Sequence, residues 1–189
     1  MLYNMQLMKL ANENGIAAYG VIMYVAFIFA AIYIGYSIGS SPITSYNYGS
    51  GNHAELKNVF RKSLIIITIV SICMLAASQL AATTLAGIFV SYDKELFDLT
   101  VNGFKLYSLS FLFSGFNIFS SAFFTALNNG LISAVISFLR TLVFQVSAVF
   151  ILPLLIGVNG IWLAVVAAEI LTLIFSVIFL ITNRKKYHY

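Results

Sequence analysis

Two charged side chains lie well inside long apolar stretches of this sequence. Arg140 directly follows the uncharged window Leu106–Leu139, and Glu169 stands alone within the apolar run Trp162–Asn183. A charge at mid-membrane costs about 2.5–3.5 kcal/mol on insertion scales, so by default it faces the interior of a helix bundle or a wet cavity. A guanidinium and a carboxylate in such places can pin two helices together, couple to an ion, or gate a pathway.

The heights of the two charges in the membrane favour a pair. At about 1.5 Å per residue, Arg140 lies ~15 Å and Glu169 ~21 Å from the same membrane side. The offset of ~6 Å is within reach of an arginine side chain, so the two groups can meet if their helices face each other. We hypothesise that they are coupled, either as a structural pair or as part of ion coupling or gating.

Other polar and aromatic side chains extend this expected substrate or ion pathway. Asn117 and Gln145 lie along apolar stretches, where such residues usually form hydrogen bonds between helices. Tyr107 belongs to a dense aromatic run, part of which could line a hydrophobic ligand cavity. The sequence lacks HExxH, Gly-x-Ser-x-Gly, a Walker loop and paired Cys or His residues. We therefore expect neither an enzyme nor a bound metal or cofactor.

The elements that position these residues are predicted to be membrane helices. Of the 189 residues, 61% are hydrophobic and only 8% are charged, too few to coat a water-facing shell. A bilayer-spanning helix needs about 20 mostly apolar residues. We predict an all-α, polytopic membrane bundle with five full transmembrane helices and the end of a sixth; the expected spans are about 16–39, 60–89, 97–127, 131–152 and 161–183.

Prolines, glycines and polar runs set the expected boundaries. Pro42 is predicted to stop the first span, and a polar stretch follows over 46–62, within which the next helix is expected to begin near Glu55. Asn128–Gly130 predicts a tight turn that makes the flanking helices an antiparallel hairpin. Pro153 is expected to end the next span, before a break at Gly157–Gly160.

Charge distribution predicts the orientation in the cell membrane. The positive-inside rule places the basic 46–62 segment and the Arg184–Lys186 tail in the cytoplasm, and the acidic Asp93–Asp98 segment outside. Five crossings then put residues 1–12 outside, so we expect these to be the end of an upstream helix in a longer protein. The basic clusters are too short for a nucleic-acid patch.

The order of several segments resembles the multidrug and toxic compound extrusion (MATE) transporters. Pro42–Asn52 follows a long apolar helix, and Lys57 and Arg61-Lys62 open the next one. The resemblance continues over nearly the whole chain, through Ile88-Phe89, Asp93–Leu96, Phe123–Leu127, Ser137–Arg140, Leu152-Pro153 and Gly157–Trp162.

This resemblance implies a fold of twelve helices in two lobes, of which the chain is most of the C-terminal lobe and the N-terminal lobe is missing. It implies export of amphipathic or cationic compounds by alternating access, driven by Na⁺ or H⁺. Some relatives carry a coupling carboxylate in the tenth helix, but this chain has no Asp or Glu between Leu99 and Leu127. Coupling is then expected in the missing lobe or through Glu169.

Two other functions remain open at this point. A lipid-linked oligosaccharide flippase of the same superfamily would share the helix count, but its cavity should hold several basic residues, and Arg140 is the only candidate. A small membrane subunit without a transport role is the second alternative. An enzyme is the least expected reading.

Overall fold

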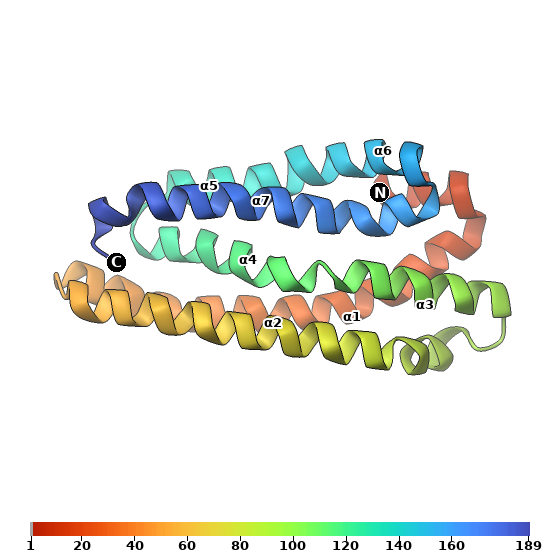
Figure 1. The fold of residues 1–189 in the computed structure, drawn as a ribbon, viewed down its shortest axis with the longest axis horizontal. Coiled ribbons are helices and arrows are strands. Elements are labelled where there is room, and N and C mark those ends of the chain that lie inside the picture. The colour runs from red at the N-terminus through yellow and green to blue at the C-terminus, as the bar shows by residue number, and fades with distance from the viewer. Residues whose placement is uncertain (1) are drawn as a thin grey trace.

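The computed structural model describes residues 2–189, which form an elongated helical bundle whose helices run along its long axis (Figure 1). In chain order the elements are α1 (Leu2–Gly49), α2 (His53–Val90), α3 (Lys94–Ser108), α4 (Phe111–Ala126), α5 (Gly130–Phe138), a π-helical segment (Leu139–Phe144), α6 (Gln145–Ile156) and α7 (Val158–Tyr187).

Helix length and composition confirm an all-helical membrane fold. α1, α2, the continuous stretch Gly130–Ile156 and α7 are each long and apolar enough to cross a membrane. α3 and α4 together make a fifth candidate span, bent by 46° where they meet. Large apolar side chains such as Ile38, Leu80 and Leu154 are exposed on the outside of the bundle, as expected of a surface that lipid covers.

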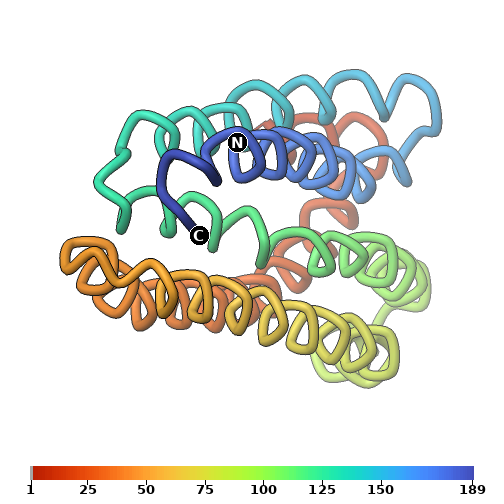
Figure 2. Tube along the Cα trace, turned by 60° about the vertical axis from the view of Figure 1, so that its left-hand side comes forward, coloured from red at the N-terminus to blue at the C-terminus, as the bar shows by residue number. Residues whose placement is uncertain are grey.

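The helices lie in layers around α4. Figure 2 shows α1 and α2 on one side, α5, α6 and α7 on the other, and α3 and α4 between them. α4 contacts α1, α2, α5 and α7, which places its side chains at the centre of the bundle. One apolar core surrounds Trp162, and a second surrounds Phe119, Phe123 and Phe124 nearer the C-terminus.

The two ends of the bundle carry different charges. The α1–α2 turn, the α4–α5 turn and the C-terminus share one end (Figure 1), where the His53 and His188 rings lie 4.6 Å apart. The amide of Asn129 donates to the Tyr187 hydroxyl at 2.8 Å across the same end. The predicted basic segments therefore meet at one end, and the acidic α2–α3 connection lies at the other (Figure 1).

The start of α1 is kinked at Ala11-Asn12. Ala11 and Asn12 have non-helical backbone angles, with φ of 50° at Asn12. The residues before this kink pack back on the bundle through Tyr3, whose ring stacks on Tyr19 with centroids 5.1 Å apart. Their origin as the end of an upstream helix stays a prediction.

The expectation that Pro42 stops the first span is wrong. α1 continues through this proline to Gly49, about two further turns. Hydroxyls on either side supply additional hydrogen bonds to the backbone: Ser41 donates to the carbonyl of Ser37 at 2.7 Å, and Thr44 to that of Ser40 at 3.1 Å.

Within the polar segment 46–62, the second helix begins close to the expected Glu55, and the non-helical part is short. The turn occupies only Ser50–Asn52, and the side chain of Asn52 caps α2 by accepting from the main-chain N–H of Glu55 at 3.2 Å. Lys57, Arg61 and Lys62 therefore lie on the first turns of α2, as the resemblance implied.

The third and fourth expected spans also differ from the prediction. The continuous helix expected over 97–127 is broken between Ser108 and Phe111. Pro153 lies inside α6, and the chain turns instead at Gly157, which has a φ of 60° that favours glycine. Gly160 then lies against the main chain of Leu152, closer than a side chain would allow.

Candidate functional site

Arg140 and Glu169 form an ion pair inside the bundle. Nε and Nη2 of Arg140 both donate to Oε1 of Glu169, at 2.9 and 2.5 Å. The Glu169 side chain is 6% exposed and that of Arg140 is 29% exposed, so the carboxylate is the more deeply buried partner. The predicted pairing is thus present, and its part in transport stays a prediction.

Asn117 completes the hydrogen bonding of this carboxylate. Its Nδ2 donates to Oε2 of Glu169 at 2.7 Å and to the main-chain oxygen of the same residue at 2.9 Å. Its Oδ1 accepts from the Ser176 hydroxyl at 3.0 Å. Both carboxylate oxygens therefore have donors. Through Asn117, α4 is hydrogen-bonded to α7 at Glu169 and at Ser176.

Two irregular segments bring these groups together. Arg140 lies in the π-helical segment Leu139–Phe144, and such segments occur frequently at functional sites. The α3–α4 break at Leu109-Ser110 lies on the other side of the site, about two turns before Asn117. The phenol of Tyr33 donates to the carbonyl of Phe111 at 2.8 Å and satisfies a backbone group just past the break.

A small cavity adjoins the ion pair. Its volume is about 70 Å³, which suits water or a small ion rather than a drug-sized compound, whose pockets run to about 300–1,000 Å³. Its walls come from α1, α3, α4, α7, the α3–α4 break and the π-helical segment; the lining residues include Tyr33, Tyr107, Ser110, Ser114, Arg140, Val165 and Glu169.

The five predicted site residues are not all in one place. Arg140, Glu169 and Asn117 are in contact, and Tyr107 lines the same cavity, with its hydroxyl 3.9 Å from the sulfur of Met23. Gln145 lies elsewhere: its Nε2 is 3.5 Å from the Tyr3 hydroxyl. The prediction that Gln145 shares the pathway finds no support in this placement.

Tyr33 is a lining residue that the sequence analysis did not single out. It is buried, and its hydroxyl lies 2.9 Å from that of Ser71 as well as bonding Phe111. A signal was available, because Tyr33, Ser37 and Thr44 recur at helical spacing and mark one polar face of an otherwise apolar helix. Within residues 2–189, no three His, Cys, Asp or Glu side chains gather in a group that could hold a metal ion.

Asn117→Ala is expected to lower the free energy of unfolding by about 2 kcal/mol, because it leaves a buried carboxylate oxygen and the Ser176 hydroxyl short of a partner. Denaturant unfolding of the purified protein measures the change. Asn102→Ala is the matched control, since the Asn102 amide bonds Asn159 at an exposed position, and it should change stability by less than about 0.5 kcal/mol. Equal losses in the two variants would contradict the buried network.

Comparison with known proteins decides the family. A family model described as MatE matches residues 1–151. This chain belongs to the MatE family. No curated protein matches the MatE chain.

Solved structures of transporters share the fold of the MatE chain. A MOP superfamily transporter from Pyrococcus furiosus superposes with a TM-score of 0.89 at 18% identity, over 100% of this chain and 42% of that one. An outward-facing multidrug resistance MATE family transporter gives 0.90 at 19% identity, over 98% of this chain and 42% of that one. An inward-facing one gives 0.90 at 18% identity, over 98% and 43%. The MatE chain thus spans less than half the length of these transporters and corresponds to one lobe.

Proposed function

We propose that the chain is the C-terminal lobe of a secondary-active antiporter that exports amphipathic or cationic compounds in exchange for Na⁺ or H⁺. The observation that carries this proposal is the buried Arg140–Glu169 pair, held by Asn117 beside a cavity of ion or water size in a MatE lobe. Ionisable groups inside membrane helices commonly mark ion pathways. The family is one of transporters, which favours transport over catalysis.

Glu169 is the proposed coupling group in this lobe. Its carboxylate is neutralised by Arg140, and a proton or Na⁺ arriving through the cavity would compete with the guanidinium for Oε1. Neutralisation of Glu169 would deprive Arg140 of its partner and loosen the contact between the π-helical segment and α7. Binding of the ion would then change how the helices of the lobe pack against one another.

The exported compound needs a second lobe. The cavity beside the ion pair is too small for it, so we place the substrate between the chain and an N-terminal lobe of similar size. The similarity to both outward-facing and inward-facing structures, each at a TM-score of 0.90, supports a lobe that keeps its internal packing while the two lobes move. The basic end of the bundle, with the C-terminus, is proposed to lie in the cytoplasm and the protein in the plasma membrane.

Reconstitution tests this function. A tag fused after Tyr189 would retrieve the chain with any attached or associated second lobe, and the purified material would be placed in liposomes. We expect efflux of a fluorescent organic cation that requires an inward Na⁺ or H⁺ gradient. The neutral pair Arg140→Met/Glu169→Gln, checked for folding, should lose the gradient dependence. Gradient-driven efflux that this folded variant retains would refute the role of Glu169.

A further inference from the structure

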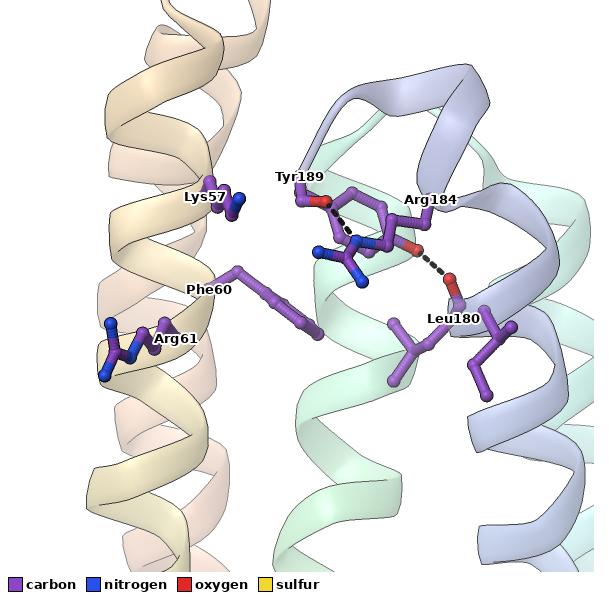
Figure 3. Close-up of a pocket in the computed structure, with 7 residues that line it drawn as sticks. Lys57, Phe60, Arg61, Leu180, Arg184 and Tyr189 are labelled. Carbon is purple, nitrogen blue, oxygen red and sulfur yellow. Dashed lines mark hydrogen bonds between the residues drawn. The ribbon is translucent and has the colours of Figure 1, made fainter.

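An apolar pocket opens between α2 and α7 at the basic end of the bundle (Figure 3). Its volume is about 280 Å³, and its walls come from Phe60 on α2, Leu180 and Ile181 on α7, and Tyr189. We call it the tail pocket because the C-terminal residue closes it. It lies at the far end of α7 from the Gly157 turn, well separated from Glu169 in sequence.

Ring contacts and hydrogen bonds hold Tyr189 in the floor of the tail pocket. Tyr189 is 4% exposed, and its ring lies 4.8 Å from that of Phe60 and 5.0 Å from that of Phe123. Its hydroxyl donates to the carbonyl of Leu180 at 2.8 Å, and Nε of Arg184 donates to its main-chain oxygen at 3.1 Å. Burial raises the pKa of the Tyr189 phenol, so the hydroxyl stays a neutral donor at physiological pH.

Three cations border this apolar floor. Lys57 and Arg61 come from α2 and Arg184 from α7, and no Asp or Glu side chain within residues 2–189 lines the pocket. Figure 3 shows Lys57 and Arg184 reaching toward the gap from opposite sides, above the ring of Phe60, whereas the Arg61 side chain points away from the gap. Glu55, the acidic residue nearest in sequence to Lys57, is bonded by the Asn58 amide at 3.1 Å and lies outside the lining.

We propose that the tail pocket binds the headgroup of an anionic phospholipid. A phosphate would lie between Lys57 and Arg184, with Arg61 at the outer edge of the lining, and an acyl chain would run along the exposed apolar side of α7 at Ile181 and Ile178. Basic pockets between membrane helices at the cytoplasmic side are suited to such headgroups, and the apolar walls favour a lipid over a soluble phosphate. The proposal needs only a membrane-embedded chain and is independent of transport.

Lipid binding to the purified protein in neutral detergent tests this site. We expect phosphatidylglycerol to raise the thermal unfolding midpoint and to remain bound in native mass spectra, while phosphatidylcholine and inorganic phosphate do neither. Lys57→Gln/Arg61→Gln should weaken phosphatidylglycerol binding at least about tenfold, since each removed charge near an anionic headgroup contributes. This pair leaves the Arg184–Tyr189 contact in place.

Lys185→Gln/Lys186→Gln is the matched control, because it removes the same charge from the same end without touching the pocket lining. It should weaken binding by less than about twofold. If both double variants weakened phosphatidylglycerol binding equally, the binding would depend on the overall surface charge of this end and not on the pocket, which would overturn the proposal. Binding of inorganic phosphate with an affinity like that of the lipid, or no preference over phosphatidylcholine, would also overturn it.

Discussion

Glu169→Gln is expected to lower the free energy of unfolding of the lobe by about 3 kcal/mol. Removing one partner of a buried ion pair leaves an uncompensated charge and typically costs about 3–5 kcal/mol; the 29% exposure of Arg140 places the expected value at the lower end. Glutamine keeps an oxygen that can accept from Asn117, so the loss is specific to the pair with Arg140. Denaturant unfolding in mixed micelles measures the change.

The neutral pair Arg140→Met/Glu169→Gln is the control for this prediction. With both charges gone, no uncompensated charge remains at this site, and most of the lost stability should return. A double variant whose loss equals the sum of the two single losses would show that Arg140 and Glu169 are not energetically coupled.

Gly160→Ala is expected to destabilise the fold by about 3 kcal/mol, at the upper end for overpacking. A Cβ at this position would lie 2.4 Å from the carbonyl carbon and oxygen of Leu152 and 2.6 Å from the nitrogen of Pro153. These are main-chain atoms of α6, which cannot move aside as a flexible side chain can. The thermal unfolding midpoint of the purified variant measures the effect.

Gly35→Ala provides the matched control. Gly35 is also helical, but a Cβ there meets nothing within 4 Å. Alanine is the better helix former by up to about 1 kcal/mol, so this variant should be neutral or slightly stabilising. If Gly160→Ala were equally harmless, the close approach of α6 and α7 at Leu152 would be refuted.

The sequence predicts a site residue best where leaving its side chain unpaired inside the membrane would cost much free energy. Arg140 and Glu169 are such a case, because an unpaired charge inside a span is expensive and the rise per residue gives the height of each group. Height alone does not give the direction in which a side chain faces. Gln145 is polar and lies in the same long helix as Arg140, yet it faces Tyr3 instead of the cavity.

Helix breaks were predicted less well because they depend on tertiary partners. Pro42 lies inside α1 and Pro153 inside α6, and neither ends its helix where it stands. The α3–α4 break at Leu109-Ser110 contains no glycine or proline that would predict it. Tyr33 of α1 bonds the carbonyl of Phe111 beside the break, and no local pattern encodes that contact.

The number of residues in the π-helical segment determines which side chains of this helix face the bundle before and after it. Its wider turn shifts the residues beyond it by about one position, or about 100° of rotation, relative to an unbroken α-helix. Arg140 faces α7 at the start of this segment, while Ala148 and Val149 are buried beyond it. Deleting one residue between them would turn one of these two faces toward lipid, whereas exchanging apolar residues would not. Related sequences should therefore vary in composition here and conserve length.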